Sequence, residues 1–303
     1  MNEYTVIGIV VAAFILAGVL SYFFTPPVKR FAHKVGAIDV PKDNRRMHKE
    51  PIPRLGGLAI FGGFLCSILV FGQLDQTMLC VLLGATIIVA LGIFDDVLAL
   101  GAKLKFIVQI IAAAIPVCVG GLQISLFTNL NPFSDAPFWH LGFLAVPVTI
   151  IWIVGITNAV NLIDGLDGLA AGVTLPVAVY FIVIGVISNN TPVVVFASAL
   201  AGGLAAFLIF NFNPAKVFMG DTGSLFLGGG GAGLAFACDQ PIALVFVGLI
   251  YVIETLSDIL QVSYYKATKK PVLDENGQPV RDAKGNVKMQ GKRIFKKAPI
   301  HHH

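Results

Sequence analysis

Long uninterrupted stretches of apolar residues decide what this chain can fold into. Each stretch holds roughly 20 residues, which is the length of a helix that crosses a bilayer. Only 13% of the residues are charged, against about 25% in a soluble domain. We therefore predict an all-α polytopic membrane protein with nine transmembrane helices in one domain, residues 1–303. The nine stretches cover residues 5–24, 55–72, 77–94, 103–121, 141–160, 168–188, 192–210, 222–238 and 241–263.

The 21 Lys and Arg residues indicate how these spans are oriented. All of them fall on one side of an alternating topology, whereas the opposite loops carry only the acids Glu3, Asp75, Asp135 and Asp239. Basic loops face the cytoplasm, so the N-terminus is expected outside. The net charge of +4 is thus a topology signal, and no nucleic-acid partner is expected. The expected cytoplasmic loops are residues 25–54, 95–105, 161–167, 211–221 and 264–303.

Two segments outside the spans carry turn signals. Residues 264–303 contain Asp-Glu-Asn-Gly at 274–277 and Lys-Gly-Asn at 284–286. Two such turns between short alternating stretches predict a small β-hairpin on the cytoplasmic side. On the outer side, the aromatic and proline-containing residues 122–140 fit either a short hairpin or a segment at the membrane surface.

Five aspartates follow directly on apolar runs and share the cytoplasmic face. Carboxylates at the ends of membrane helices are costly unless they are paired, hydrated or bound to a cation. Five of them at one face therefore predict a metal-assisted active site, and oxygen ligands of this kind suit Mg²⁺. They are Asp95, Asp96, Asp164, Asp167 and Asp221.

The pair Asp95-Asp96 ends the third run, with Lys105 close behind. At a helix end, one carboxylate can bind a cation while its neighbour accepts a proton or orients the lysine. A purely structural role is disfavoured, because acids at the C-terminal end of a helix oppose its dipole.

The other three aspartates lie in two further motifs. Asp164 and Asp167 follow Asn161 at intervals of three, so the three side chains share one face if the segment is helical. Asp221 lies in Gly-Asp-Thr-Gly-Ser, a turn into a helix whose free backbone N–H groups can meet a phosphate. Taken alone, Asp221 also fits a plain helix N-cap.

Two basic segments lie on the same predicted face as the acidic motifs. Residues 45–57 form a proline-stiffened loop that contains Lys49 and Arg54, and either positive-inside charge or phosphate binding explains it. Residues 293–303 end in three histidines, which fit either the start of a purification tag or a phosphate-binding segment. Carboxylates together with Lys, Arg and His are typical of magnesium-dependent phosphoryl transfer.

These motifs together resemble the polyprenyl-phosphate N-acetylhexosamine-1-phosphate transferases, over nearly the whole chain. The matching segments are residues 95–96, 161–167, 211–224 and 298–303, in the order and topology of the family. The resemblance identifies the histidines as the family's own motif. It also implies ten membrane helices, so a tenth helix is expected beyond His303.

What the resemblance implies is transfer of a sugar 1-phosphate from a UDP-sugar to undecaprenyl phosphate, with release of UMP. The reaction would use Mg²⁺ on the cytoplasmic face of the bacterial inner membrane, and a homodimer is compatible with it. Asp221 and Asp95 would bind the metal. Asp95 would also deprotonate or orient the lipid phosphate with help from Asp96, and Lys105 and Lys49 would face phosphates.

The remaining assignments by resemblance concern the two ends of the nucleotide sugar. The uridine pocket would be lined by Asn161, Asp164 and Asp167, with Phe218 stacking on uracil. Asn211 would help to order the metal site, and His301 and His302 would meet the sugar-phosphate side.

The two ends of the chain resemble different branches of the family. Residues 46–57 are similar to the GlcNAc-1-phosphate transferases of teichoic acid and O-antigen synthesis, whereas residues 293–303 are similar to the phospho-MurNAc-pentapeptide transferases of peptidoglycan synthesis. The last cytoplasmic loop is expected to meet the sugar, which favours phospho-MurNAc-pentapeptide. A secondary transporter is the remote alternative, but it would place its charges near the bilayer midplane. Here the only acids inside a predicted span are Glu254 and Asp258.

Overall fold

The computed structural model describes residues 3–41, 50–128, 138–274, 278–281 and 285–295. Within them, six helices are long and apolar enough to cross a membrane, which confirms an all-α, multi-pass membrane protein. The six are Tyr4–Val35, Gln76–Leu98, Ala102–Val119, Gly142–Ile163, Leu169–Ile187 and Thr191–Asn211.

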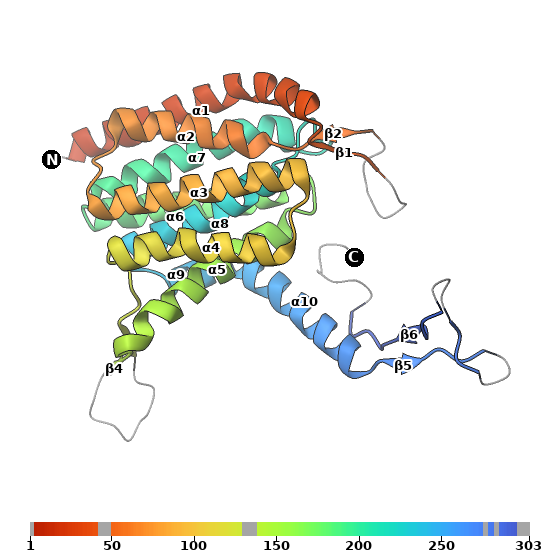
Figure 1. The fold of residues 1–303 in the computed structure, drawn as a ribbon. Coiled ribbons are helices and arrows are strands. Elements are labelled where there is room, and N and C mark those ends of the chain that lie inside the picture. The colour runs from red at the N-terminus through yellow and green to blue at the C-terminus, as the bar shows by residue number, and fades with distance from the viewer. Residues whose placement is uncertain (1–2, 42–49, 129–137, 275–277, 282–284, 296–303) are drawn as a thin grey trace.

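The helices follow one another along the chain, and short strands lie between α1 and α2 and between α4 and α5 (Figure 1). The α-helices are α1 (Glu3–Val35), α2 (Gly56–Phe71), α3 (Gln76–Leu98), α4 (Ala102–Ala114), α5 (Ala145–Ile163), α6 (Leu169–Ile187), α7 (Thr191–Asn211), α8 (Gly220–Ala237), α9 (Ala243–Val247) and α10 (Leu249–Ala267). A π-helical turn (Ile115–Val119) extends α4, and a 3₁₀ turn (Gly142–Leu144) precedes α5.

Helix α8 lies inside the bundle, where it packs against α2, α3 and α5. Its glycines allow the helix backbones to approach closely: a Cβ atom on Gly228 would lie only 2.6 Å from Cα of Thr157 on α5. Helix α7 packs on the other side against α1, α2 and α6. The bundle thus holds the N-terminal end of α8, which carries Asp221, next to the C-terminal end of α3.

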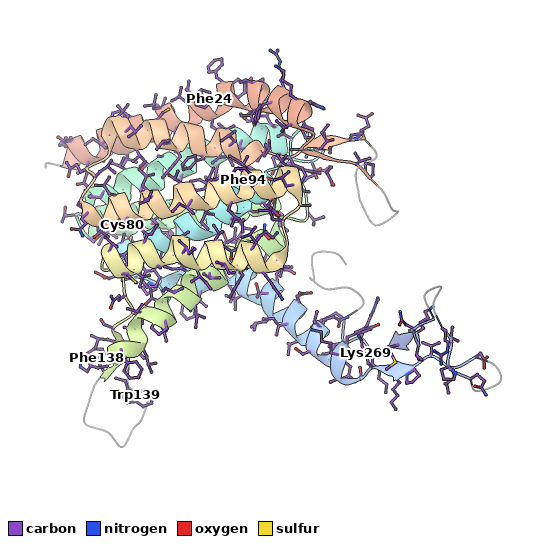
Figure 2. All side chains as sticks on the ribbon, viewed as in Figure 1. Phe24, Cys80, Phe94, Phe138, Trp139 and Lys269 are labelled. Carbon is purple, nitrogen blue, oxygen red and sulfur yellow. The ribbon has the colours of Figure 1, made fainter. Side chains whose placement is uncertain are left out.

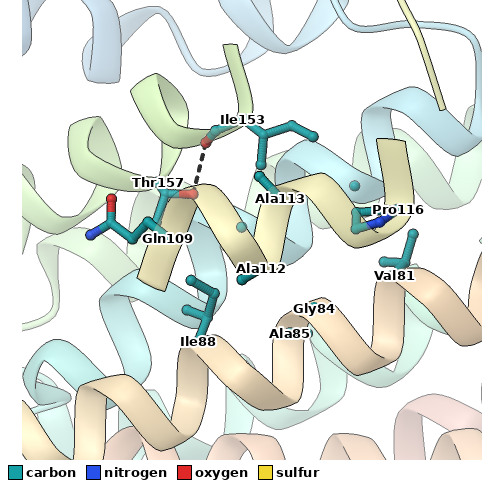
Figure 3. Close-up of a pocket in the computed structure, with 12 residues that line it drawn as sticks. Val81, Gly84, Ala85, Ile88, Gln109, Ala112, Ala113, Pro116, Ile153 and Thr157 are labelled. Carbon is teal, nitrogen blue, oxygen red and sulfur yellow. Dashed lines mark hydrogen bonds between the residues drawn. The ribbon is translucent and has the colours of Figure 1, made fainter. Parts of the chain in front are cut away.

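Small residues also bring α3 and α4 together around a cavity of about 20 Å³ (Figure 3). Gly84 of α3 faces the carbonyl oxygen of Ala112 on α4, which a Cβ atom would approach to 2.7 Å. The hydroxyl of Thr157 borders the cavity but donates to the carbonyl oxygen of Ile153, the dashed line in Figure 3. The cavity is about large enough for one water molecule, so it is a packing gap within the bundle.

The structure departs from the predicted helix ends at both ends of the chain. The first helix continues past residue 24, through Pro26 and Pro27 to Val35, because this extension packs Ala32 against Ala37 and Leu55. The last apolar run, expected as one span over 241–263, is divided at Gly248 into α9 and α10. Helix α10 then projects away from the bundle (Figure 1).

The described residues contain three short antiparallel strand pairs, of which two lie between helices and the third follows α10. β1 (Ile38–Asp39) pairs with β2 (Ile52–Pro53), β3 (Leu126–Thr128) with β4 (Phe138–His140), and β5 (Lys270–Pro271) with β6 (Met289–Gln290). The last two pairs fall in the segments with turn signals. Exposed Phe138 and Trp139 lie at one end of the molecule, and Lys269 lies near the other (Figure 2).

Candidate active site

The C-terminal end of α3 brings Asp95 and Asp96 to the start of α4 and α8; Phe94, labelled in Figure 2, marks this end. The ammonium of Lys105 on α4 lies 2.8 Å from Oδ2 of Asp95 and 3.0 Å from Oδ2 of Asp221. The second oxygen of Asp95 accepts a hydrogen bond from the backbone N–H of Leu100 at 2.8 Å. One lysine therefore joins carboxylates from two helices that are far apart in sequence.

Asp96 faces away from this lysine and caps the first turn of α8. Its Oδ1 accepts from the N–H of Asp221 at 3.0 Å, and its Oδ2 accepts from the N–H and the hydroxyl of Thr222 at 2.9 and 2.7 Å. The first N–H groups of a helix lack partners within the helix, and a negative charge there is stabilised by the helix dipole. Because the Asp96 side chain is 0% exposed, its carboxylate holds the two helices in register.

A glycine is required where α8 begins against this carboxylate. Gly220 has a φ of +71°, a conformation that side chains disfavour, and a Cβ atom there would lie 2.9 Å from Cγ of Asp96. The motif Gly-Asp-Thr-Gly-Ser thus starts a helix at the closest approach of its backbone to Asp96.

Replacing Thr222 by Val should loosen this capped helix end. The change keeps the shape of the side chain and removes one hydrogen bond to a buried carboxylate, so the free energy of unfolding should fall by about 2 kcal/mol. Thermal unfolding of the purified protein in detergent measures this loss.

Thr86→Val is the matched control, because the exposed Thr86 on α3 only donates to the carbonyl of Leu82 in its own helix. Its effect should stay within about 0.5 kcal/mol. Equal losses in both variants would contradict the capping role of Asp96.

Asn161 at the end of α5 supports Asp221 from the other side. Its side-chain N–H₂ donates to Oδ1 of Asp221 at 3.2 Å and to the hydroxyl of Ser224 at 2.8 Å. Both oxygens of Asp221 are therefore oriented, one by Lys105 and one by Asn161. This fixed carboxylate is the centre of the site.

Asp164 follows α5 and faces the same cluster. Burial raises the pKa of its carboxyl well above the usual range, and the negative charges of Asp96 and Asp221 raise it further, while Arg54 opposes them. Its side chain makes no hydrogen bond to another of the described residues. A carboxylate in this position favours the approach of a cation or of a hydrogen-bond donor.

Asp167 and Asn211 stabilise the loops around the site and do not lie at its centre. Oδ2 of Asp167 accepts from the side chain of Asn213 at 3.1 Å and from the N–H of Ala215 at 2.9 Å. The buried Asn211 accepts from the N–H of Gly168 at 3.1 Å and donates to the carbonyl of Val217 at 3.0 Å. These bonds tie the end of α7 to the start of α6 and to the segment that leads into α8.

The remaining predicted residues lie at the edge of the site or outside the described part. Half-buried Phe218 stands three residues before Asp221. Lys49, His301 and His302 lie outside the described residues. Of the predicted set, the structure brings together Asp95, Asp96, Lys105, Asn161, Asp164 and Asp221.

The sequence predicted no individual site role for three residues that the structure brings to the cluster, and it gave the first of them only as part of the basic loop 45–57: Arg54, Thr222 and Ser224. Arg54 lies 3.5 Å from Asp96 and 3.8 Å from Asp221. The two glycines that follow it in Pro-Arg-Leu-Gly-Gly were a usable signal, since paired glycines often mark a close backbone approach.

The donor set fits a magnesium ion that is shared with a substrate. Within the described part of the chain, no group of three His, Cys, Asp or Glu side chains is arranged to hold a metal by itself. Mg²⁺ usually binds one or two carboxylates together with water and substrate phosphates. The carboxylates of Asp221 and Asp95, which share Lys105, meet that requirement, and the side chain of Asn161 lies beside them.

The chain matches one family model and is similar to several named transferases. The family model described as glycosyl transferase family 4 matches residues 78–239, which include Asp95, Lys105, Asn161 and Asp221. A probable undecaprenyl-phosphate N-acetylglucosaminyl 1-phosphate transferase of Bacillus subtilis is 44% identical over 220 residues, covering 72% of this chain and 60% of that protein.

Other relatives match along the full chain. A phospho-N-acetylmuramoyl-pentapeptide-transferase of Clostridium botulinum is 34% identical over 309 residues, covering 99% of this chain and 87% of that protein. A protein of the same name from Listeria welshimeri is 34% identical over 317 residues, covering 100% and 90%. The matched segments contain the acidic cluster and the helices that build it, and the chain belongs to glycosyl transferase family 4.

Proposed function

We propose that this protein transfers a sugar 1-phosphate from a UDP-sugar to undecaprenyl phosphate and releases UMP. The observation that carries the proposal is the Lys105 ammonium held between Asp95 and Asp221. Fixed cations and carboxylates at one end of a membrane bundle suit phosphoryl transfer, in which catalysis consists mainly of positioning and charge stabilisation. The names of the full-length relatives support the same reaction.

We assign the site to the cytoplasmic face of the bacterial inner membrane. The distribution of Lys and Arg supports this orientation. We also propose that α2, α8 and the α9–α10 segment complete a set of nine spans. Helix α8 is glycine-rich and almost wholly buried, so it needs less lipid-facing apolar surface than the outer helices.

Asp221 and Asp95, with Asn161, would hold Mg²⁺, which supplies positive charge to the diphosphate when it is bound. Lys105 orients both carboxylates and is placed to contact a phosphate oxygen. Asp96 and Asn211 act as positioning residues, because their polar atoms already bind the backbone around α8. We assign the nucleoside to Asp164, Asp167 and Phe218, with Phe218 stacking on uracil.

The reaction we propose is a direct displacement. An oxygen of the lipid phosphate attacks the phosphorus that carries the sugar, and a new P–O bond forms. The bond from that phosphorus to the bridging oxygen breaks, and its electron pair leaves with UMP. The alternative is a covalent phosphate on Asp95 or Asp221, which labelled UMP exchanging into the UDP-sugar without lipid would reveal.

For the donor sugar we propose phospho-MurNAc-pentapeptide. The relatives with this name match along nearly the whole of this chain, and residues 293–303 resemble that branch. The second candidate is GlcNAc-1-phosphate, which the higher identity to the Bacillus subtilis relative favours.

Offering each donor separately to the purified protein tests both proposals. With undecaprenyl phosphate and Mg²⁺, we expect release of UMP from UDP-MurNAc-pentapeptide and little from UDP-GlcNAc. The reverse preference would reject phospho-MurNAc-pentapeptide and retain sugar-1-phosphate transfer. Release from neither donor, by protein that is folded in detergent, would reject the transferase proposal itself.

A further inference from the structure

Arg54 stands at the edge of the acidic cluster with unused hydrogen-bond donors. Its guanidinium lies 3.5 Å from Oδ1 of Asp96 and 3.8 Å from Oδ1 of Asp221. These separations are ion pairs rather than hydrogen bonds, and the side chain makes no hydrogen bond to another described residue. Its side chain is 37% exposed, against 0% for Asp96. The charged fork of Arg54 therefore lies near two carboxylates and is accessible.

The backbone around Arg54 is attached to the start of α8 by three hydrogen bonds. The N–H of Phe218 donates to the carbonyl of Pro53 at 2.8 Å, and the N–H groups of Gly56 and Gly57 donate to the carbonyls of Phe218 and Met219 at 2.9 Å. A Cβ atom on Gly57 would come within 2.7 Å of the carbonyl carbon of Thr222, so the two segments touch through their backbones.

Backbone strain marks the residue that follows Arg54. Leu55 is 0% exposed and has a φ of 143°, which is rare for a residue with a side chain. Such a conformation persists only where the surroundings enforce it. Here the buried Leu55 side chain packs with Ala32 and Ala37 where α2 begins. The backbone of Arg54 is therefore held next to the segment that leads into α8.

The neighbours of Arg54 do not need it for their own hydrogen bonds. Asp96 already accepts three hydrogen bonds from α8, and Asp221 accepts from Lys105 and Asn161. Lys105 donates to two carboxylates, which leaves one of its three N–H groups for a phosphate. Arg54 makes no hydrogen bond to another described residue, so its guanidinium can match two oxygens of a phosphate at once.

We propose that Arg54 binds a phosphate group of a reacting substrate. This inference rests on the proposed function and adds a residue to it that lies outside the matched family segment 78–239. The phosphate belongs either to the diphosphate of the nucleotide sugar or to the lipid phosphate. In both cases the bound anion lies beside Asp221.

Arg54→Gln in the full chain removes the charge and the paired donors. Charged hydrogen bonds of this kind are worth about 10- to 100-fold in affinity. If Arg54 binds the diphosphate, R54Q should weaken the affinity for UDP, measured by calorimetry, about 10- to 100-fold. The affinity for uridine should stay unchanged. If the lipid phosphate is bound, UDP binding should be retained and KM for undecaprenyl phosphate should rise. Arg54→Lys should recover only part of either loss, because it restores the charge without the planar fork.

Arg30→Gln is the matched control, since Arg30 is an exposed arginine on α1 outside the cluster. The ratio of UDP to uridine affinity separates recognition from folding, because a loosened site weakens both ligands together. R54Q with an unchanged ratio and an unchanged KM for the lipid would overturn the role of Arg54. Wild-type protein that binds no UDP and releases no UMP would instead refute the proposed function on which the role depends.

Discussion

Asp221→Asn should lower the turnover of this protein on the order of 10³-fold, the largest effect expected from one side chain in the site. The asparagine keeps the size of the side chain and can still accept from Asn161. It loses the negative charge that faces Lys105 at 3.0 Å and the oxygen that would bind Mg²⁺. Release of UMP from the accepted donor measures the loss.

A second measurement ties this loss to the metal. Mn²⁺ can replace Mg²⁺ as a spectroscopic probe, and electron paramagnetic resonance should count about one bound ion in the wild type and far less in D221N. Asp239→Asn is the matched control, because Asp239 follows the opposite end of the same helix. Near-normal turnover and Mn²⁺ binding in D221N would refute the assignment of Asp221 as the metal ligand.

Gly92→Ala should both destabilise the protein and inactivate it. A Cβ atom at Gly92 would lie 2.5 Å from the backbone N of Thr222 and 2.7 Å from the carbonyl carbon of Asp221. Since both neighbours are backbone atoms, α3 and α8 must separate. We expect a loss of about 3 kcal/mol, at the upper end for overpacking. The resulting shift of the carboxylates should lower turnover by roughly 10²-fold.

Gly172→Ala controls for the added methyl group, because this exposed glycine of α6 has no neighbouring atom within 4 Å of a Cβ position. Alanine there should be neutral or slightly stabilising through its helix propensity. Thermal unfolding and UMP release, measured on both variants in one detergent, provide the comparison. Equal stability of the two variants would show that the contact between α3 and α8 is looser than described.

The convergence of four of the five aspartates was predictable, because it depends on helix ends and loop charges that the sequence displays directly, whereas Asp167 binds a neighbouring loop. Which partner each aspartate binds was not predictable. Asp95 and Asp96 are adjacent and chemically identical, yet one binds Lys105 while the other caps α8. Which helix end lies opposite each carboxylate depends on how distant helices pack, and a local motif does not contain that information.

The same reasoning explains the other differences. The sequence left open whether the basic loop with Arg54 orients the protein or binds phosphate, because the backbone at Leu55 and its bonds to the start of α8 leave no mark on hydropathy. The apolar run 241–263 looked continuous, because the break at Gly248 changes the direction of the chain without changing its composition. The first helix was predicted to end at residue 24 because its apolar run ends there, whereas tertiary packing continues the helix through Pro26 and Pro27.

The cap that Asp96 provides for α8 has a consequence for the order in which the molecule assembles. Its three donors come from residues 221 and 222, which leave the ribosome long after residue 96 has entered the membrane. Until then the carboxylate must stay hydrated at the lipid headgroups, because an unpaired charge is costly to bury. The C-terminal end of α3 therefore gains these hydrogen bonds only when α8 inserts. The candidate site is thus completed late in biosynthesis.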